Sequence, residues 1–461
     1  MGWIGLMPYD PTDAARRLRS LLDRDPALAF TKAFLRDHPG ADLYLVGGAL
    51  RDALLGRDAK DVDLVARGRA RGELERWLRS RGAVELVGET FGVYKFLPHG
   101  ISPKERPFVD VALPRREHAS AGSLGGYRDF DLQVDPMLPI EADLARRDFT
   151  VNAMAYDLRR GTIVDPWHGQ SDLRLGVIRA VGVPGERFLE DLSRLLRAIR
   201  FAAELGFDIE DATRLALHEA APNINDVRET DGVRHFVVPR ETVGSELAKA
   251  FVAHAFVAAD LLQKSGLMRE LLPEAEASFS GDARFFEPLR ALPAGRLTAA
   301  LALLMRAVPA ATVIPALKRV GLDTLPSGSP LRAHLDDVAW IVTRIQQGAP
   351  DPATMRPGLF ERTFMNGHAK NYVLVLKALG NDAVVAAAEM RAQELRRAWG
   401  VTEDERIPAL VSGDDAIAAG LAPGPRVRLA LDAVRDAQLE GTVMTRTRAL
   451  KWLKEHLGTA Y

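Results

Sequence analysis

The stretch that decides the fold runs from residue 47 to residue 64 and reads GGALRDALLGRDAKDVDL. It directly follows Asp42–Val46, an apolar segment (DLYLV) that predicts a short strand. The glycine pair ends that strand, the apolar spacing in Ala49–Leu55 predicts a helix, and Asp61–Val65 (DVDLV) predicts a second strand. The order strand, glycine pair, helix, strand is typical of a turn that holds a phosphate group at a helix start.

The glycine pair is the first candidate for binding chemistry. Gly47 and Gly48 have no side chain to obstruct an anion, and the N–H groups at a helix start carry partial positive charge. Arg51 lies one turn into the predicted helix and adds a full charge. The alternative is an ordinary strand-to-helix turn in which the glycines only permit tight packing.

Three aspartates are the candidates for a metal site. Asp61 and Asp63 are two apart on the predicted second strand, so both should point to one face. Asp110, in the predicted strand Phe108–Leu113, is expected to lie beside them. Carboxylates without histidine or cysteine form an oxygen site, which suits Mg²⁺ bound together with substrate phosphates. A solvated edge strand is the alternative interpretation of the first two aspartates.

The composition excludes several other classes of protein. The chain has 461 residues and no cysteine, which excludes a disulfide scaffold, a thiolate metal site and a cysteine nucleophile. Its 61 Lys+Arg and 62 Asp+Glu nearly cancel, but nucleic-acid binding depends on local clusters and stays open. No stretch approaches the roughly 18 apolar residues of a membrane span, and the first residues lack the basic region of a secretory signal. We therefore expect a cytoplasmic protein with no membrane partner.

The motifs together resemble a known family. Residues 47–64 match the pattern GGxxRDxxxGxxxxDxD of the polymerase-β-type nucleotidyltransferases. More narrowly, the chain resembles the bacterial class II tRNA CCA-adding enzymes and their poly(A) polymerase relatives. Residues 146–153 (RRDFTVNA) are similar to the family's RRDxxxNA motif, and residues 190–194 (EDLSR) fit EDxxR. The resemblance is strong through about residue 250 and weak beyond it.

The periodicity and the resemblance together predict an α+β fold, in which a mixed-sheet nucleotidyltransferase head precedes an elongated all-helical neck, body and tail. Residues 42–113 predict the order β-α-β-α-β-β-β, residues 114–145 a long loop, and the chain after about residue 185 mainly helices. The expected domains are the head at 1–180, the neck with its nucleotide-selecting motif at 181–265, the body at 266–350, and a tRNA-binding tail at 351–461.

Arg147, Asp148 and Asn152 of the RRDFTVNA segment are expected to lie on neighbouring faces of one helix. The planar guanidinium of an arginine suits phosphate. The carboxylate and the amide can bind ribose hydroxyls, which favours NTP over dNTP. An isolated motif of this kind would more often be a surface ion pair at a helix start.

Asp191 and Arg194 of the EDLSR segment are three apart and are expected to share one face of a helix. They present an acceptor beside donors, which matches the base edges of cytosine and adenine and opposes those of guanine and uracil. The resemblance implies this base-selecting role, with Glu190 holding the pair in place. Arg197 lies in the LLRAIRF segment that follows, and we expect it to bind the nucleotide as well. A purely structural ion pair is the common alternative.

The resemblance implies template-independent addition of CCA to the tRNA 3′ end from CTP and ATP. Asp61, Asp63 and Asp110 would hold two Mg²⁺ ions while the RNA 3′-hydroxyl attacks the α-phosphate in line. An enzyme that adds only A, or a poly(A) polymerase, is the alternative, and a non-catalytic RNA-binding protein is a remote one. The sequence leaves the choice between a monomer and a homodimer open.

Several details bear on the subgroup. Residues 87–95 lack the His-Val pair typical of poly(A) polymerases, and residues 115–143 look too long for a CC-only enzyme. No His-Asp dipeptide occurs, so we expect no metal-dependent phosphohydrolase domain. The segment Met444–Gly458 predicts a terminal helix with a basic face for tRNA, although a merely solvated basic face explains the pattern equally well.

Overall fold

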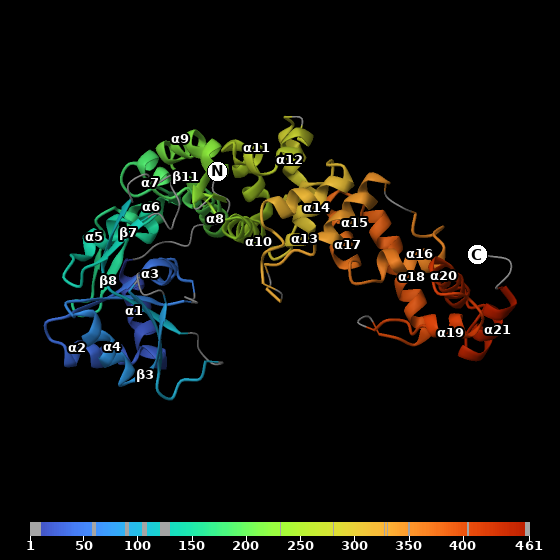
Figure 1. The fold of residues 1–461 in the computed structure, drawn as a ribbon, viewed down its shortest axis with the longest axis horizontal. Coiled ribbons are helices and arrows are strands. Elements are labelled where there is room, and N and C mark those ends of the chain that lie inside the picture. The colour runs from blue at the N-terminus through green and yellow to red at the C-terminus, as the bar shows by residue number, and fades with distance from the viewer. Residues whose placement is uncertain are drawn as a thin grey trace. The chain divides into compact units, whose positions relative to one another are not determined.

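The computed structural model describes most of the chain. The residues that it describes are 11–57, 61–87, 92–103, 108–119, 130–230, 232–279, 281–326, 328–329, 331–348, 351–402 and 405–456. The chain divides into two compact units (Figure 1). The first comprises Met1–Glu276 with Lys318–Leu331, and the second comprises Ala277–Leu317 with Arg332–Tyr461. The finer division into head, neck, body and tail stays a prediction.

The first unit contains a seven-stranded sheet in the order β3-β4-β5-β2-β1-β8-β9. Strand β2 runs parallel to β5 and every other neighbouring pair is antiparallel, so the sheet is mixed, as predicted. The strands are β1 (Asp42–Val46), β2 (Asp63–Arg67), β3 (Gly82–Val87), β4 (Val93–Pro98), β5 (Val109–Ala112), β8 (Ala155–Asp157) and β9 (Thr162–Val164). The predicted α+β fold class is confirmed.

Strand β1 lies inside this sheet, and four of its five residues are buried. Strand β2 pairs with it up to the partners Val46 and Asp63, so β2 begins at Asp63 rather than at Asp61 as predicted. The reason is that β1 ends there, because Gly47 turns away with a φ of +69°. Asp61 therefore lies in a bend ahead of the strand.

The segment 114–145, predicted as a loop, contains a hairpin and a helix. Strand β6 (Arg115–Ala119) pairs antiparallel with β7 (Phe130–Val134), and helix α5 (Ile140–Ala145) follows. The prediction was wrong because a two-stranded hairpin outside the main sheet pairs through its backbone and needs no alternation of apolar residues. Residues 120–129 of the predicted loop lie outside the described residues.

Helices complete the first unit, and α10 packs along α8. They are α1 (Pro11–Arg24), α2 (Phe30–Asp37), α3 (Gly47–Leu54), α4 (Arg71–Arg79), α5, α6 (Gly169–Leu175), α7 (Pro184–Glu190), α8 (Ser193–Leu205), α9 (Asp211–Ala220), α10 (Arg240–Lys264) and α11 (Leu267–Leu271).

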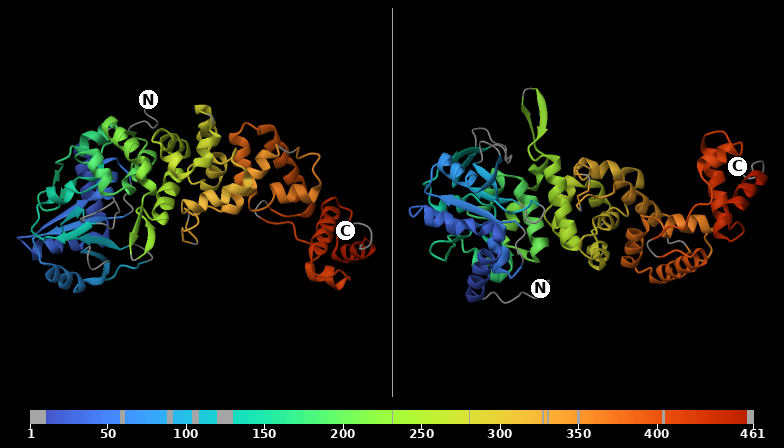
Figure 2. Two further views of the ribbon diagram at one scale, coloured as in Figure 1. Left: turned by 45° about the horizontal axis from the view of Figure 1, so that its top comes forward. Right: turned by 90° about the horizontal axis from the view of Figure 1, so that it is seen from below.

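The predicted neck, residues 181–265, is not all-helical as predicted, because it contains the hairpin of β12 (Val227–Thr230) and β13 (Val233–Phe236). Figure 2 shows this hairpin as yellow-green strands that project from the helices. Its strand β13 is exposed throughout, so no apolar pattern marks it in the sequence. A short parallel pair, β10 (Val177–Ile178) with β11 (Asp208–Ile209), lies near the start of the neck.

The second unit is built from helices. They are α13 (Leu297–Leu304), α15 (Leu335–Gln346), α16 (Pro357–Phe364), α17 (Ala369–Ala378), α18 (Asp382–Trp399), α19 (Gly413–Ala418), α20 (Pro425–Leu439) and α21 (Arg446–His456). Helices α12 (Pro273–Ser278) and α14 (Ala310–Arg319) each span a boundary between the two units. Within the described parts of the chain, no helix is long and apolar enough to cross a membrane.

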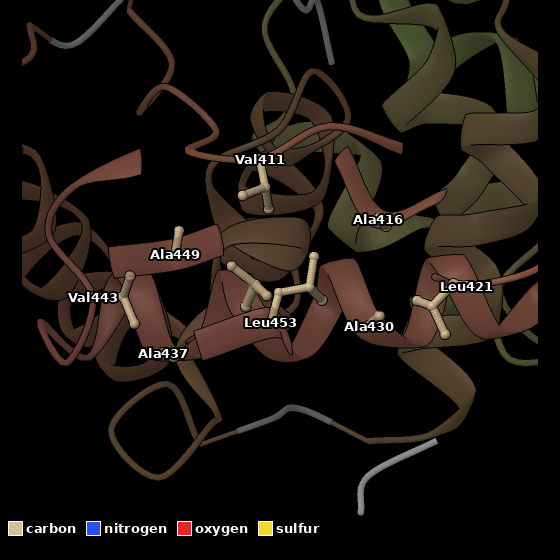
Figure 3. Close-up of a cluster of buried hydrophobic side chains, with 9 residues drawn as sticks. Val411, Ala416, Leu421, Ala430, Ala437, Val443, Ala449 and Leu453 are labelled. Carbon is tan, nitrogen blue, oxygen red and sulfur yellow. The ribbon is translucent and has the colours of Figure 1, made fainter. Parts of the chain in front are cut away.

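The last three helices of the second unit enclose a small core of their own. It consists of Val411, Ala416, Leu421, Ala430, Val434, Ala437, Val443, Ala449 and Leu453. Figure 3 shows Leu453 of α21 near the centre of this cluster. The predicted terminal helix is therefore anchored by its apolar face, and Arg448 and Lys454 on its other side are exposed.

We expect the substitution Leu453→Ala to loosen this tail core. Leu453 is fully buried among mostly small side chains, so truncation leaves a cavity that costs about 3 kcal/mol. Hydrogen exchange of residues 405–456 should then accelerate by about two orders of magnitude. Leu429→Ala is the matched control, because Leu429 on α20 is 51% exposed and its loss should change little. Unchanged protection in Leu453→Ala would contradict the prediction.

Candidate active site

Asp63 and Asp110 lie side by side on two parallel strands. They occupy the same register position of β2 and β5, so their side chains project from one face of the sheet. Asp61 lies exposed in the bend before β2. Burial raises the pKa of both strand carboxyls, and the charge of Asp61 raises each further, against the opposing effects of Arg147 on Asp63 and Lys95 on Asp110. The three carboxylates are thus close enough to repel one another.

These carboxylates fit a divalent cation whose coordination is completed by substrate. Among the residues with a described placement, no three His, Asp or Glu side chains gather to hold a metal ion by themselves. Burial is the main cause of the raised pKa values of Asp63 and Asp110, and a cation would offset the charge repulsion that adds to it. Mg²⁺ commonly binds through one or two carboxylates together with water and substrate phosphates. The donor set therefore suits Mg²⁺ bound with a nucleotide.

Gly47 lies directly against the carboxylate and the guanidinium of this site. A Cβ atom at Gly47 would lie 3.2 Å from Oδ2 of Asp63 and 3.3 Å from Nη1 of Arg147, and one at Gly48 would lie 3.6 Å from Nη2 of Arg51. The Nε atom of Arg147 is buried and has no hydrogen-bond partner among the described residues. A buried cationic donor without a partner beside a helix start is suited to a phosphate group.

We expect Gly47→Ala to reduce nucleotide turnover by about 10- to 100-fold. A side chain at a φ of +69° costs about 1–2 kcal/mol, and its Cβ would crowd Asp63 and Arg147, the groups suited to a metal ion and a phosphate. Single-turnover kinetics with CTP would measure the effect. Gly40→Ala is the control, since a Cβ there meets no atom within 4 Å. Equal rates in the two variants would contradict the assigned role of Gly47.

The RRDFTVNA segment does not form one helix, contrary to the prediction. Helix α5 ends at Ala145, and a short 3-10 helix begins only at Thr150. Between them residues 146–148 form a turn and two bends, and Phe149, which has extended backbone, forms a β-bridge with Ala180. The physical reason is that the Asp148 carboxylate accepts the N–H of Phe149 at 2.8 Å, which competes with helix formation.

Asp148 lies at the centre of a hydrogen-bond network. Its Oδ1 accepts from Nδ2 of Asn152 at 3.2 Å, and its Oδ2 accepts from Nε and Nη2 of Arg197 at 2.9 and 2.5 Å. Arg51 in turn donates to Oδ1 of Asn152 at 2.8 Å. Burial alone would raise the pKa of Asp148, but Arg197 and these hydrogen bonds together hold it far below its usual range. The network therefore contains an ionised carboxylate at neutral pH.

The EDLSR segment forms the junction of two helices rather than one helix face, so that prediction was also wrong. Helix α7 ends at Glu190 and α8 begins at Ser193, whose N–H donates to Oδ1 of Asp191 at 2.9 Å. Arg194 nevertheless lies next to Asp191, with Nε 4.0 Å from Oδ2, and it donates to Glu190 at 2.8 Å. Burial raises the pKa of Asp191. Arg194 also donates to the carbonyl of Arg146 at 3.1 Å, which joins this junction to the preceding motif.

Asp143 is a residue of this site that the sequence analysis missed. It is fully buried, and its Oδ1 accepts from Nε of Arg146 at 3.0 Å and from the N–H of Arg115 at 3.2 Å. Its Oδ2 lies 3.5 Å from Nη2 of Arg147. One carboxylate thus holds both arginines of the motif and the first residue of β6. The sequence spacing could have identified Asp143, because it precedes the two arginines by three and four residues, the spacing of helical ion pairs.

Comparison with known proteins adds family information. Residues 43–179 match the Poly A polymerase head domain. A multifunctional CCA protein of Laribacter hongkongensis is 38% identical over 235 residues, which cover 51% of this chain and 51% of that protein. The chain thus matches about half the length of such curated relatives. A CCA-adding enzyme of Geobacillus kaustophilus is 32% identical over 436 residues, which cover 90% of this chain and 93% of that protein.

Solved structures are similar over nearly the whole chain. The Bacillus stearothermophilus CCA-adding enzyme in complex with CTP has a TM-score of 0.68 and 26% identity, covering 94% of this chain and 98% of that chain. The Thermotoga maritima CCA-adding enzyme complexed with tRNA has a TM-score of 0.61 at 20% identity, covering 96% and 98%. At that identity the second similarity concerns the fold alone.

Proposed function

The chain belongs to the family of CCA-adding enzymes, and we propose that it adds CCA to the 3′ ends of tRNA from CTP and ATP. The observation that supports this most is the adjacency of Asp63 and Asp110 to Gly47 and Arg147. It combines carboxylates for a metal ion with a cradle for phosphate, the two parts that phosphoryl transfer needs. The presence of CTP in a related structure supports the choice of nucleotide.

The protein's part in the reaction is to hold the reactants in line. The N–H groups at the start of α3 and the unpartnered Nε of Arg147 would bind the triphosphate. Asp61, Asp63 and Asp110 would bind two Mg²⁺ ions, whose chemistry is to lower the pKa of the RNA 3′-hydroxyl and to stabilise the leaving group. The hydroxyl oxygen attacks the α-phosphorus while the bond to the β-phosphate breaks, so pyrophosphate leaves and the RNA gains one nucleotide.

Selection of the nucleotide would rest on two neighbouring sets of residues. Asp148 and Asn152 would bind the ribose hydroxyls, which favours NTP over dNTP. Asp191 would accept from the exocyclic amine of cytosine or adenine, and Arg194 would donate to the acceptor beside it. Guanine and uracil place the opposite polarity at these positions. The Glu190 carboxylate, 2.8 Å from Nη1 of Arg194, would keep that guanidinium in place.

Addition of CTP and ATP to tRNA that ends before CCA, after C, or after CC would test this proposal. With Mg²⁺ present, we expect C, C and A to be added in that order, with a stop after A. Extension only of the CC end with ATP would indicate an A-adding enzyme, and unlimited A tails would indicate a poly(A) polymerase. The absence of any addition would favour a non-catalytic RNA-binding protein. The cytoplasmic location and the oligomeric state stay predictions.

A further inference from the structure

Phe201 of α8 lies against the guanidinium groups of three arginines. The Cζ atoms lie 5.2 Å from the ring centroid for Arg51, 5.3 Å for Arg197 and 3.9 Å for Arg200. The Phe201 side chain is 6% exposed, and its ring packs edge-on against Phe149 with the ring centroids 5.8 Å apart. All three distances are within the range at which an aromatic face attracts a cation. Phe201 was not among the site residues expected from the sequence.

Each of these three cations has its own carboxylate partner. Nη2 of Arg51 lies 2.8 Å from Oδ1 of Asp52, and Arg197 donates to Oδ2 of Asp148. Nε of Arg200 donates to Oε2 of Glu246. The carboxylate partners balance the charges of the three arginines. The Phe201 ring is the one group that all three guanidinium groups approach, and an aromatic face attracts cations at these distances.

Two of the three arginines connect Phe201 to the residues proposed to read the sugar. Arg51 donates to Asn152, Asn152 donates to Asp148, and Arg197 donates to Asp148. These contacts form a closed circuit of side chains that begins and ends at Phe201. A change at the phenyl ring is therefore expected to alter the position of both arginines and, through them, of the amide and the carboxylate.

We propose that Phe201 is a positioning residue that holds Arg51 and Arg197 so that Asn152 and Asp148 face the ribose. This inference rests on the proposed function. The Phe201 side chain is buried against these arginines and Phe149, so its loss is expected to act through the orientation of the sugar-binding groups. Because small displacements in an active site reduce rates strongly, we expect Phe201→Leu to lower the preference for CTP over dCTP, as the ratio of kcat/KM values, by about tenfold or more.

The test compares three variants of the full chain. Phe201→Leu removes the aromatic face and keeps an apolar side chain, while Phe201→Tyr keeps the face and should retain most of the preference. Phe207→Leu is the matched control, because Phe207 follows the same helix and is also 6% exposed. Thermal unfolding of each variant separates lost folding from lost selectivity. A second measurement, equilibrium binding of CTP and dCTP in the presence of Mg²⁺, does not depend on turnover.

The outcomes separate this inference from the proposed function. A reduced preference in Phe201→Leu, with near wild-type values in Phe201→Tyr and Phe207→Leu, would support the positioning role. The same preference for CTP in Phe201→Leu as in wild type would overturn it, and so would an equal loss in Phe207→Leu. If the wild-type chain adds no nucleotide to any tRNA, the proposed function fails, and the sugar-reading role of Phe201 fails with it.

Discussion

Replacing Asp63 with asparagine is expected to reduce nucleotide addition by about 10³-fold or more, since loss of metal-assisted charge stabilisation amounts to several kcal/mol. Asp63 is half-buried beside Asp110, and both carboxyls have raised pKa values. An amide at this position keeps the shape and the packing of the side chain but removes the negative charge that a metal ion needs. Single-turnover incorporation of CMP into tRNA would measure the loss, and binding of tRNA should change little.

The same substitution should leave the folded protein at least as stable at neutral pH. Burial raises the pKa of Asp63 in the folded state, so the charged form disfavours folding at pH values above its unfolded pKa. Asparagine removes this penalty. The melting temperature of Asp63→Asn should therefore equal or exceed that of wild type at pH 7, and the difference should vanish in acid, where both states are protonated.

Glu85→Gln is a suitable control for Asp63→Asn. Glu85 lies exposed on β3 of the same sheet, and the substitution makes the same change of charge outside the site. Its turnover should match wild type. If Asp63→Asn also adds nucleotides at the wild-type rate, the metal-binding assignment of this carboxylate is wrong.

Asp148→Asn is expected to reduce both stability and activity. The variant places an amide against Arg197, whose guanidinium then loses its ionic partner. Breaking a buried pair costs about 3–5 kcal/mol, and because Arg197 is 35% exposed we expect roughly 2–4 kcal/mol here. Displacement of the network should also reduce turnover by about 100-fold. Chemical unfolding and single-turnover kinetics would measure the two effects.

The loss of stability in Asp148→Asn should depend on pH. Arg197 and hydrogen bonds depress the folded pKa of Asp148 despite its burial, so this carboxylate stabilises the fold above its unfolded pKa of about 4. That stabilisation is lost as pH falls toward the folded pKa. The deficit of the variant should therefore be full at pH 7 and should shrink progressively below about pH 4. A deficit that stays constant into acid would contradict the assignment.

Asp157→Asn separates a general effect of losing a buried carboxylate from the effect on the site. Asp157 is buried on β8 and pairs with Arg160, outside the hydrogen-bond network of Asp148. We expect this control to lose stability while keeping the wild-type turnover per folded molecule. An equal loss of turnover in both variants would indicate that the Asp148 effect is only structural.

The elements of the head could be predicted from the sequence where burial is encoded locally. The buried strand β1, the glycine pair and the start of α3 follow from apolar spacing and from residues that permit tight turns. The hairpins β6–β7 and β12–β13 could not be predicted in this way, because both pair outside the main sheet and the exposed strand β13 carries no apolar alternation. The helical assignments of the two motif segments failed because the side chains of Asp148 and Asp191 bind nearby backbone N–H groups.

The sequence by itself determined the order of the elements over residues 42–113, the family and the residue types of the site, since each depends on spacing along the chain. Only the tertiary structure decided how those residues meet. Arg51 and Asn152 are 101 positions apart, and Asp148 and Arg197 are 49 apart. Phe201 joins both pairs because α8 packs its aromatic side chain against arginines from separate elements. The spacing of apolar residues indicates which face of a helix is buried, but which element packs against that face depends on how the whole unit folds.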